Sequence, residues 1–472
     1  MNLKSIKSIH FTGIKGVGLT SLALCAQDLG ISVSGSDIAE EFVTDPILKL
    51  RGISYTVGFS PNHLPPATNL LIYTAAHQGP NNPEVIAARE QGIPAISHAE
   101  AVGMFMQEKI GISVCGVGGK STTSAMLATI LEHAKLKPSY TVGVGNIPCL
   151  GTPGKYDRHG KYFIAEADEY FASPGTDNTP KFLYQTPQVI GVTTIRYDHP
   201  DVYPDFDATC QAYLDFFNKL PKNGLLVAYA DSSETIKVAK KSAKHLITYG
   251  THPQADIQLK SYHVAEGKTL CTISYHGIEH ELVLQVPGKF NAINALCAFA
   301  IATKLDVDPR IATNALKEFT GTMRRFENIG TTKSGVTIID DYAHHPGEIQ
   351  ATLTAAKEWF PKRKVIAIFQ PHTFSRTKAL FADFAQSFGT ADEAVILPIY
   401  ASAREAFDPS IKSQDLVAAA NQSSRVSYQE NAASLIQYLK STLEPNPVVI
   451  TLGAGDIFLL GKKLLKGLWT QS

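Results

Sequence analysis

The amino-acid sequence predicts an α/β protein of three domains, each built around a largely parallel sheet. Two features of its 472 residues point to this class. Short apolar runs typical of buried strands alternate with longer segments of helical periodicity, and a glycine-rich turn follows the opening strand of two such units. Strand–helix alternation implies parallel strands joined by right-handed crossovers. A chain of this length forms roughly two to four domains with independent cores.

The first domain is expected over residues 1–107 and opens with a strand–helix–strand unit. A strand at 6–12, a glycine turn, a helix and a strand at 31–34 follow in order, and the unit ends at Asp37. Three weaker elements come next: a strand at 70–76, a helix at 82–92 and a strand at 93–97. This order indicates an α/β domain.

The second domain, expected over 108–320, begins with an apolar strand that leads through a glycine-rich turn into the helix STTSAMLATILEHAK. This helix places its apolar side chains broadly on one side, as a core-facing helix requires. Further strands are expected at 162–167, 189–194 and 224–230. Alternation over 269–286 predicts a hairpin that turns at His276 and Gly277, and a helix follows it.

The third domain, expected over 321–472, continues the alternation. A helix between its first two strands repeats apolar residues at spacings of four, three and four from Ile349 to Phe360. A second helix is expected around Leu380 to Phe388. Strands are expected at 336–341, 364–369, 393–399 and 448–457.

Composition and charge favour small-molecule chemistry over nucleic-acid or membrane binding. Apolar residues make up 44% of the chain, charged residues 18%, and the formal net charge is zero, so neither sign is in excess. The N-terminus lacks an apolar stretch long enough for a signal peptide, and no run of about 18 apolar residues occurs. The six cysteines are scattered without a CxxC spacing, which favours reduced core thiols. We therefore expect a cytoplasmic protein.

A phosphate-binding loop is predicted from GVGGKST, residues 116–122, between the first strand and the helix of the second domain. Glycine backbone N–H groups can close around phosphate oxygens, and the following helix start favours negative charge. Lys120 would reach the β- and γ-phosphates, and the Ser121 hydroxyl would ligate Mg²⁺. The spacing is GxxGK[ST], because Val114 stands where GxxxxGK[ST] has its first glycine. The loop alone leaves a motor or switch, a kinase and a carboxylate-activating enzyme open.

Two later strand ends carry candidate metal ligands. Glu166 and Asp168 end the strand YFIAEA, and His199 follows the strand VIGVTT. Ligands gather at the carboxyl ends of parallel strands, where carboxylates bind Mg²⁺ and a histidine binds a metal or contacts a phosphoryl group. Solvent-facing charges and a turn histidine are the alternatives. We interpret Glu166 and His199 as metal ligands.

The N-terminal glycine turn, GIKGVG at 13–18 with Asp37 downstream, partly matches a dinucleotide fingerprint. Its spacing is GxxGxG, whereas the NAD fingerprint is GxGxxG. The start of the following helix still suits a pyrophosphate. The turn therefore favours a diphosphate ligand other than NAD, with NAD binding and a purely structural turn as alternatives.

Two motifs follow strands of the third domain. The first, DDYAHHP at 340–346, could form a metal site, or its Asp341 and His345 could orient the ribose and base of a nucleotide. The second, FQPHTFSR, places His372 and Arg376 after the next strand. An arginine there suits recognition of a carboxylate or a phosphate.

Taken in order, these motifs resemble the Mur ligase family over essentially the whole chain. The specific feature is the series GIKGVGLTSLA with SGSD, GVGGKSTT, EADEY, DHPD, FNAINAL, RRFE, DDYAHHPGEI, QPHTFSRT and LGAGDI. The resemblance implies a Rossmann-like N-terminal domain for a UDP-sugar and a central P-loop ATPase domain with a β-rich segment. It also implies a Rossmann-like C-terminal domain that contributes to nucleotide and amino-acid binding.

The resemblance also implies a reaction, which is ATP-dependent amide formation with Mg²⁺. The lactyl carboxylate of UDP-N-acetylmuramate would attack the γ-phosphate of ATP, and an amine would then attack the acyl phosphate. The motifs favour L-alanine as this amine, the first amino acid added in peptidoglycan precursor synthesis, with a preformed tripeptide as the alternative. The remote alternatives are a nicotinamide-dependent oxidoreductase and a catalytically silent nucleotide-binding protein. We expect a monomer or weak homodimer without a nucleic-acid or membrane partner.

The resemblance assigns roles to individual residues. In the catalytic set, Lys120 would stabilise the transferred phosphoryl group, Ser121 and Glu166 would bind one Mg²⁺, and His199 would bind a second metal ion. The other ATP-binding residues would be Gly116, Val117, Gly118, Gly119, Thr122, Asn291, Asn294, Arg325 and Asp341. The UDP moiety would face Gly16, Val17, Gly18 and Asp37. The amino-acid and muramoyl groups would lie among Tyr342, His345, His372 and Arg376.

The sequence departs from the family pattern at three places. Val117 and Gly118 replace the usual threonine and histidine of the phosphate loop, and Phe59 stands where a histidine is frequent near the uridine. No lysine occurs between His199 and Lys219, so the carbamylated lysine of some Mur ligases is not expected.

Overall fold

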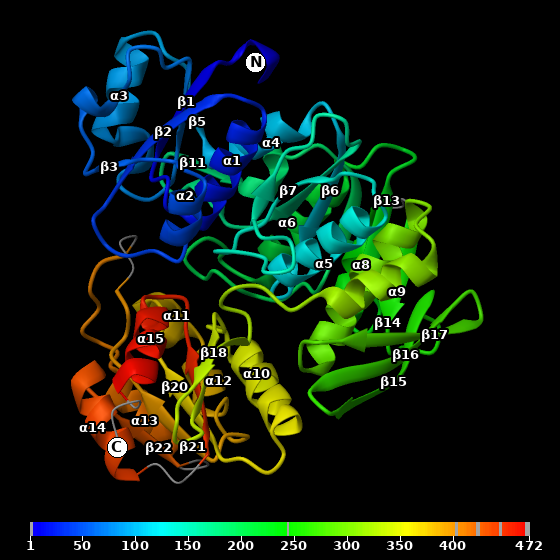
Figure 1. Cartoon of the computed structure of the whole chain (residues 1–472), viewed down its shortest axis with the longest axis vertical. Helices are drawn as coiled ribbons and strands as arrows, with labels where there is room; N and C mark the ends of the chain where they lie inside the picture. Colours follow the sequence, from blue (N-terminus) through cyan, green and yellow to red (C-terminus); the bar gives the residue numbers. More distant parts are fainter. Residues whose placement is uncertain (1–2, 243–244, 402–404, 422–424, 443–445, 468–472) are drawn as a thin grey trace. The chain divides into compact units, whose positions relative to one another are not determined.

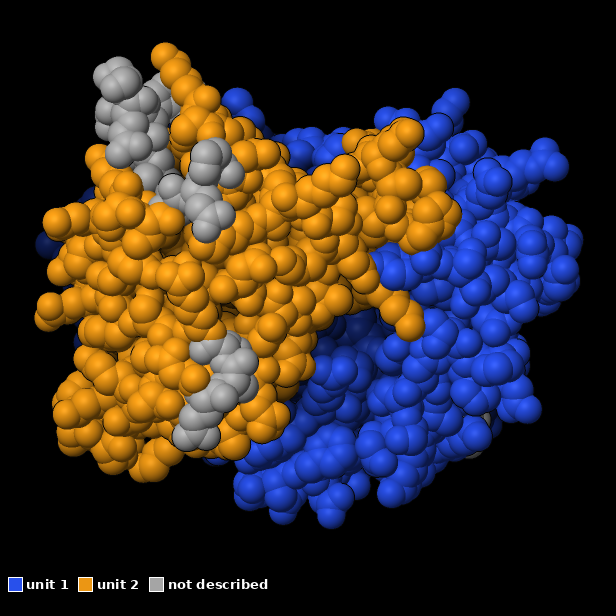
Figure 2. Space-filling view, turned by 90° about the horizontal axis from the view of Figure 1, so that it is seen from below, with its two compact units in different colours: residues 1–262, 271–284, 292–322 blue, residues 263–270, 285–291, 323–472 orange. Residues whose placement is uncertain are grey.

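The computed structural model describes residues 3–242, 245–401, 405–421, 425–442 and 446–467. They divide into two compact units, which Figure 2 distinguishes by colour. Unit 1 comprises residues 1–262, 271–284 and 292–322, and unit 2 comprises residues 263–270, 285–291 and 323–472. Across the described chain, no helix is both long and apolar enough to cross a membrane.

The N-terminal part of unit 1 is a five-stranded parallel sheet of order β3-β2-β1-β4-β5 (Figure 1). Its strands are β1 (Ser8–Thr12), β2 (Ser32–Asp37), β3 (Thr56–Val57), β4 (Leu70–Tyr73) and β5 (Ala95–Ser97). Its helices are α1 (Val17–Asp28), α2 (Asp45–Leu50), α3 (Pro83–Glu90) and α4 (His98–Met106). Short 3-10 turns occupy Leu3–Ser5, Pro61–His63 and Gly79–Asn81.

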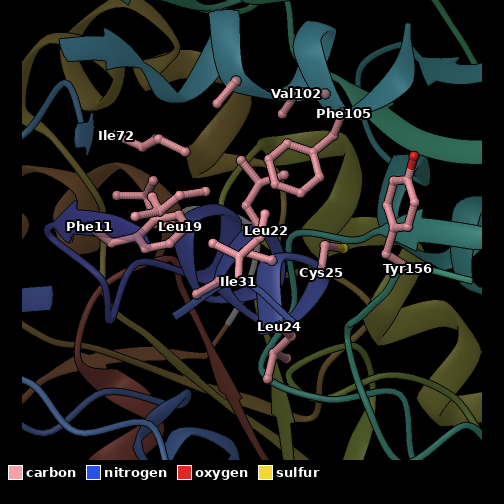
Figure 3. Close-up of a cluster of buried hydrophobic side chains, with 14 of the residues drawn as sticks. Phe11, Leu19, Leu22, Leu24, Cys25, Ile31, Ile72, Val102, Phe105 and Tyr156 are labelled. Carbon is pink, nitrogen blue, oxygen red and sulfur yellow. The ribbon is translucent and has the colours of Figure 1, made fainter. Parts of the chain in front are cut away.

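The main core of this region lies between the sheet and helices α1 and α4. Figure 3 shows Leu19, Leu22 and Cys25 of α1 among the buried side chains of this cluster. Phe105 of α4 contacts Tyr156 edge-on, with the ring centroids 6.1 Å apart. Tyr156 follows the central-domain strand β8 (Gly154–Lys155), so one continuous core joins the N-terminal sheet to the next sheet of the same unit.

The central part of unit 1 contains a ten-stranded sheet of order β17-β16-β15-β14-β13-β12-β6-β9-β7-β8. Strands β14, β13, β12, β6, β9 and β7 pair in parallel, whereas β8 pairs with β7 antiparallel. Besides β8, the strands of this sheet are β6 (Ile110–Cys115), β7 (Ser139–Thr141), β9 (Tyr162–Ala167), β12 (Pro187–Val192), β13 (Leu225–Tyr229), β14 (His245–Gly250), β15 (Ile257–Ala265), β16 (Lys268–Tyr275) and β17 (Ile278–Leu284). A separate antiparallel pair consists of β10 (Phe171–Ser173) and β11 (Asp177–Pro180).

Helices cover both faces of the parallel strands. The central helices are α5 (Lys120–His133), α6 (Phe206–Phe217), α7 (Ser233–Lys241), α8 (Lys289–Lys304) and α9 (Pro309–Glu318), and a 3-10 turn spans Lys181–Tyr184. Helices α6 and α7 pack on the face that carries Ile190 and Val192 of β12. Gly191 points to the opposite face, where its lack of a side chain allows Cys297 and Ile301 of α8 to approach. A two-faced cover of this kind explains why β12 is apolar without interruption from Val189 to Val192.

Unit 2 is built on a six-stranded sheet of order β18-β19-β23-β20-β21-β22, drawn in yellow to red in Figure 1. The bounds are β18 (Glu327–Thr331), β19 (Thr337–Asp341), β20 (Val365–Phe369), β21 (Glu393–Ile396), β22 (Val426–Tyr428) and β23 (Val448–Leu452). Only β18 among these described strands runs antiparallel to its neighbour. Helices are α10 (Pro346–Trp359), α11 (Phe374–Ala379), α12 (Phe381–Ala385), α13 (Ser413–Ala420), α14 (Ala432–Thr442) and α15 (Ile457–Gly467).

Alternate strand residues of unit 2 enter two separate cores. Ile339 lies in a cluster with α10, α12 and α13, whereas its neighbour Ile338 lies in a cluster with α14 and α15. The sheet is therefore covered by helices on both faces, as its apolar strands predict.

The predicted α/β class is confirmed, although several elements were not predicted, among them β7, β14, α6, α7 and α9. The strand predicted at 162–167 is β9 with the same bounds, and the predicted turn at His276 and Gly277 joins β16 to β17. The strand expected over 448–457 is wrong beyond Leu452, where β23 ends, and α15 begins at Ile457. All six cysteines lack a disulfide in the described structure, as expected.

Candidate active site

The predicted phosphate loop lies between β6 and α5, at the carboxyl edge of the central sheet. Gly116 and Gly119 have φ values of +118° and +80°, which favour glycine. A Cβ at Gly116 would collide with the Thr193 hydroxyl, and a Cβ at Gly119 would collide with the Asn294 side chain. The loop is thus enclosed by residues that follow β12 and by helix α8.

The loop backbone is partly engaged by the protein itself. The Val117 N–H donates to the carbonyl of Thr194 at 2.7 Å, and the Thr193 hydroxyl donates to the Gly118 carbonyl at 2.7 Å. The Val117 N–H is therefore not directed at a phosphate, in contrast to the predicted backbone cradle. Ser121 and Thr122 lie buried in the first turn of α5, where the helix start favours an anion.

Lys120, the first residue of α5, forms an ion pair with a carboxylate that the sequence did not single out. Its Nζ atom lies 3.0 Å from Oε2 and 3.3 Å from Oε1 of Glu169. The Glu169 side chain is only 2% exposed. Burial favours the neutral amine, but the charges of Glu169 and Asp168 outweigh it and raise the pKa of Lys120 above its usual value. The lysine is therefore a fixed positive charge at the loop.

Asp168 belongs to the same charged group. The Nζ atom of Lys181 lies 2.7 Å from Asp168 Oδ2, and the Lys181 side chain is 19% exposed. Burial opposes ionisation, yet Lys181, Lys120 and His199 hold the pKa of Asp168 well below its usual range. Lys120 thus pairs with Glu169, and Lys181 pairs with the neighbouring Asp168.

His199 approaches this group from the loop after β12. Its Nε2 atom lies 3.9 Å from Glu169 Oε1 and 3.6 Å from Asp198 Oδ2, and its ring contacts Tyr170 with centroids 4.9 Å apart. His199 adopts φ +59°, which is unusual for a residue with a side chain. One ligand atom from each of Asp168, Glu169 and His199 lies within 4.8 Å of the others, a spacing that suits a divalent cation.

Glu166, expected to bind one Mg²⁺ together with Ser121, is engaged by a backbone N–H group. Its Oε1 atom accepts a hydrogen bond from the Gly143 N–H at 2.7 Å, so the carboxylate turns toward the loop after β7. Among the described residues, the group that could hold a metal contains His199, Asp168 and Glu169 but not Glu166. Glu166 still contributes negative charge at Lys120.

The predicted UDP-sugar residues lie at the carboxyl edge of the N-terminal sheet. Gly16, Val17 and Gly18 are partly exposed at the start of α1, where the helix leaves backbone N–H groups for an anion. Asp37 is buried, and its carboxylate accepts hydrogen bonds from the N–H groups of Lys15 at 2.7 Å and Ile38 at 2.8 Å. Asp37 therefore braces the glycine turn in the ligand-free fold.

His98, the first residue of α4, packs directly on this turn. A Cβ at Gly18 would lie 2.6 Å from His98 Nε2, so only glycine fits beneath the imidazole. Burial lowers the pKa of His98 to about 4, with a further contribution from the charge of Lys181. The imidazole is therefore neutral near pH 7.

In unit 2, Asp341 ends β19 as a buried carboxyl group. It accepts hydrogen bonds from the N–H groups of Phe326 and Ala343, both at 2.7 Å. Burial nevertheless raises the pKa of Asp341 to about 6, although Arg325 and the two hydrogen bonds oppose the shift. Arg325 lies over the Tyr342 ring, with Cζ 4.9 Å from the centroid.

The side chain of the adjacent Arg324 is held by hydrogen bonds within unit 2. Its guanidinium donates to Asp340 at 3.0 Å and to the carbonyls of Gly453 and Gly455 at 2.6 and 3.2 Å. This residue therefore joins the RRFE segment to the LGAGDI segment. Arg325 stays a prediction as the ligand-binding arginine.

The remaining predicted residues of unit 2 lie after β19 and β20. The His345 Nδ1 atom accepts a hydrogen bond from the Gly347 N–H at 3.2 Å, so His345 caps α10. The His372 ring stacks on Tyr400 with centroids 5.6 Å apart, and lies 6.5 Å from the ring of His344. Arg376 is buried in α11, and Tyr342 is partly exposed.

Asn291 and Asn294 both lie buried in α8. The Asn291 Nδ2 atom donates to the Pro287 carbonyl at 2.7 Å, which fixes the start of the helix. Asn294 is the member of the pair that reaches the phosphate loop, through Gly119.

The residues missed by sequence reasoning are mainly partners of predicted ones. Glu169 and Lys181 flank Asp168, and the EADEY motif offered three acidic residues without indicating which one meets Lys120. Their directions depend on the chain after β9, where the period of the strand no longer applies. The length of the apolar strand does not indicate which of the three carboxylates contacts Lys120.

Comparison with known proteins supports this architecture. Profiles described as Mur ligase family catalytic domain, Mur ligase middle domain, and Mur ligase glutamate ligase domain match residues 8–110, 114–302 and 324–455. The chain is similar to UDP-N-acetylmuramate--L-alanine ligase of Desulfitobacterium hafniense, with 36% identity over 97% of this chain and 99% of the relative. It is similar to the enzyme of the same name from Caldanaerobacter subterraneus, with 38% identity over 99% of both chains.

The fold agrees with solved structures over nearly the full length. The UDP-N-acetylmuramate-alanine ligase MurC of Thermotoga maritima superposes with a TM-score of 0.81 and 26% identity, covering 98% of this chain and 100% of that chain. The murein peptide ligase mpl of Psychrobacter arcticus gives a TM-score of 0.72 at 22% identity and covers 99% of both chains, a likeness of fold. With three matching domains and relatives above 30% identity across its length, the chain belongs to the Mur ligase family.

Proposed function

We propose that this protein ligates L-alanine to the lactyl carboxylate of UDP-N-acetylmuramate with hydrolysis of ATP to ADP and phosphate. The observation that carries the proposal is the fixed Lys120 ammonium at the start of α5, between a glycine loop and the acidic ends of β9. Relatives with 36% and 38% identity over almost the whole chain bear the name of this activity. The reaction would be the first amino-acid addition in peptidoglycan precursor synthesis, in the cytoplasm.

The chemistry requires activation because a free carboxylate is a poor electrophile. An oxygen of the lactyl carboxylate attacks the γ-phosphorus of ATP, the bond to the β-phosphate oxygen breaks, and ADP leaves. The neutral amine of L-alanine attacks the resulting acyl phosphate at its carbonyl carbon. The tetrahedral intermediate expels phosphate, and the ammonium proton passes to a base. The protein contributes mainly positioning and charge neutralisation.

In unit 1, Lys120 would neutralise charge on the transferred phosphoryl group. The N–H groups at the start of α5, together with Gly118, Gly119 and Thr122, would hold the phosphates of ATP, and Asn294 would reach the nucleotide from α8. We assign Val117 a packing role in the loop, because Thr194 accepts the Val117 N–H. Gly116 would allow the turn itself.

A divalent cation fits the donors at this edge. We propose that Ser121 and Glu166 hold one Mg²⁺ and that His199 holds a second metal ion, near which Asp168 offers a further carboxylate within 4.8 Å of the histidine. When bound, Mg²⁺ would withdraw charge from the phosphate oxygens. Hydroxyl, carboxylate and imidazole groups at the ends of three adjacent strands are donors of the kind that such ions use in proteins.

The remaining ligands would be held by the N-terminal sheet and by unit 2. The diphosphate of UDP would meet the N–H groups of Gly16, Val17 and Gly18, while Asp37 keeps the turn in shape. Arg325 and Asp341 would contact the nucleotide, and Asn291 would fix the start of α8. The amino-acid and muramoyl groups would lie among Tyr342, His345, His372 and Arg376.

An acceptor screen tests the proposal. ADP release would be measured with ATP, Mg²⁺ and UDP-N-acetylmuramate, and with L-alanine, glycine, L-serine or L-Ala-γ-D-Glu-meso-diaminopimelate as the amine. We expect the highest kcat/KM with L-alanine and none without the UDP-sugar, and mass spectrometry should show the amide product. Higher kcat/KM with the tripeptide would replace the alanine assignment by tripeptide ligation. Tight NADH binding without ATP dependence would contradict a ligase altogether.

A further inference from the structure

The ion pair between Lys120 and Glu169 is unusual because the carboxylate is almost completely buried. The Glu169 side chain is 2% exposed, whereas that of Lys120 is 18% exposed. The main chain of Glu169 is also fixed, because the Tyr203 hydroxyl donates to its carbonyl at 2.6 Å. The pKa of the Tyr213 hydroxyl is raised by burial and by the negative charge of Glu169. The carboxylate therefore lies closed to solvent, beside the Lys120 ammonium and near the Tyr213 hydroxyl.

This burial constrains what Lys120 can do when a nucleotide binds. A lysine that moved away to a phosphate would leave the Glu169 carboxylate charged and buried, which is costly. The other nearby imidazole or ammonium group that the structure records at Glu169 is His199, and its Nε2 atom is 3.9 Å from Oε1. His199 is thus a poorer partner than Lys120, whose Nζ lies at 3.0 Å.

The geometry leaves Lys120 free to act without leaving the carboxylate. An ammonium group has three N–H donors. The two Glu169 oxygens, 3.0 and 3.3 Å from Nζ, lie on one side of it. The remaining donors are available to phosphate oxygens. The Lys120 side chain is 18% exposed, whereas that of Glu169 is 2% exposed, so a ligand can reach the lysine but not the carboxylate.

We propose that Glu169 is a positioning residue of the ligase reaction, which anchors the Lys120 ammonium so that it contacts the transferred phosphoryl group from a fixed point. The inference rests on the phosphoryl role proposed for Lys120. Glu169 acts through Lys120 and touches none of the three substrates. Without the anchor, the flexible four-carbon chain of lysine would sample positions away from the phosphoryl group, and misplacement by about 1 Å can cost roughly a hundredfold in rate.

The test compares Glu169→Gln with Glu132→Gln in steady-state ADP release with L-alanine and UDP-N-acetylmuramate. Glu132 pairs with Lys155 at 2.6 Å in the last turn of the same helix, so its variant makes the same chemical change at a distant ion pair. We expect Glu169→Gln to lower kcat roughly tenfold to a hundredfold, with the KM for ATP and the Mg²⁺ requirement within about twofold of wild type. Glu132→Gln should retain wild-type values.

A double-mutant cycle distinguishes anchoring from a general structural effect. If Glu169 acts through Lys120, then Lys120→Met and Lys120→Met/Glu169→Gln should have the same residual kcat within about twofold. In thermal unfolding, Lys120→Met alone should lower Tm, and the second substitution should restore part of the loss because no carboxylate is left unpaired. Glu169→Asp, which keeps the charge, serves if Glu169→Gln does not fold, and its kcat should lie between those of wild type and Lys120→Met.

Several results would overturn the inference. Unchanged kcat with a lower KM for ATP in Glu169→Gln would mean that Glu169 restrains Lys120 only before nucleotide binds. A large rise in the Mg²⁺ requirement would identify Glu169 as a metal ligand instead. Independent, multiplicative losses in the double-mutant cycle would indicate a structural role. If the wild type itself showed no acceptor-dependent ADP release, the proposed function would fail and this inference with it.

Discussion

Two carboxyl groups at the ends of parallel strands, one in each unit, have opposite electrostatic environments. Asp168 in unit 1, whose side chain is 38% exposed, lies 2.7 Å from Lys181, and nearby positive charges hold its pKa well below the usual range although desolvation opposes this. Asp341 in unit 2 accepts two backbone hydrogen bonds, yet burial raises its pKa to about 6. The charges of Lys181, Lys120 and His199 thus outweigh desolvation at Asp168, whereas two N–H dipoles and the charge of Arg325 do not at Asp341.

The charges at these two strand ends therefore respond differently to pH. At the phosphate-loop edge of unit 1, Lys120 and Asp168 keep their charges over a wide pH range, because each has an oppositely charged side chain beside it. The Asp341 edge of unit 2 titrates close to neutral pH and is therefore sensitive to a charged or hydrogen-bonding ligand.

The largest effect should come from removing the positive charge in unit 1. Lys120→Ala should lower kcat by roughly 10²- to 10³-fold, because a preorganised charge at the phosphoryl group is lost. Steady-state ADP release would measure this, with circular dichroism as the control for folding. A folded variant with near wild-type kcat would show that the paired charges of unit 1 serve only structure.

The second effect concerns the pH dependence of unit 2. The raised pKa of Asp341 means that the folded protein binds more protons than the unfolded chain between about pH 4 and 6, so the free energy of unfolding falls as pH rises through that range. The contribution is about 3 kcal/mol, present as a penalty above pH 6 and absent below pH 4. Asp341→Asn should remove it.

Urea unfolding at several pH values between 4 and 7.5 would compare this variant with the wild type. The difference in unfolding free energy between Asp341→Asn and wild type should grow in favour of the variant as pH rises. A difference that stays constant with pH would show that backbone hydrogen bonds stabilise the Asp341 carboxylate as well as lysines stabilise that of Asp168.

The smallest effect should come from separating the outer pair in unit 1. Lys181→Met should lower the free energy of unfolding by about 1 kcal/mol or less, because the pair is partly open to solvent. Lys155→Met, which removes a lysine that is 34% exposed against 19% for Lys181 and breaks the pair with Glu132, is the matched control and should cost less. The low pKa of Asp168 contributes stability above about pH 4, so the loss in Lys181→Met should shrink as pH falls toward 3. A loss independent of pH would mean that packing of the lysine chain, not its charge, is responsible.

The sequence predicted the elements that have a clear period. The strand at 162–167 and the hairpin turn at His276 and Gly277 were predictable because strand alternation and apolar runs reflect burial directly. The antiparallel pair β10 and β11 was not predicted, because both strands are short and β11 is largely polar, and their pairing depends on the loop around them. The break after Leu452 was also missed, since apolar residues continue on both sides of it in strand and then helix.

At the candidate site, the sequence identified the motif but not the pairing inside it. Lys120, Asp168 and His199 lie together, whereas Glu166 turns to Gly143 and Glu169 takes the place beside Lys120. Side chains beyond a strand end do not follow its alternation, so spacing alone could not distinguish these carboxylates. The direction of the Val117 N–H depends on Thr194, which is distant in sequence, and was equally inaccessible.

Because Asn294 lies close to the phosphate loop, the residues possible at position 119 depend on the residue at position 294. A side chain at position 119 would need both a left-handed backbone and the space that Asn294 fills. Replacing Gly119 is therefore tolerable only if position 294 becomes smaller in the same lineage, which would also alter the residue proposed to reach the nucleotide. Positions 119 and 294 should consequently vary as a pair among related chains, and a library that randomises both should recover active combinations that single changes at position 119 cannot.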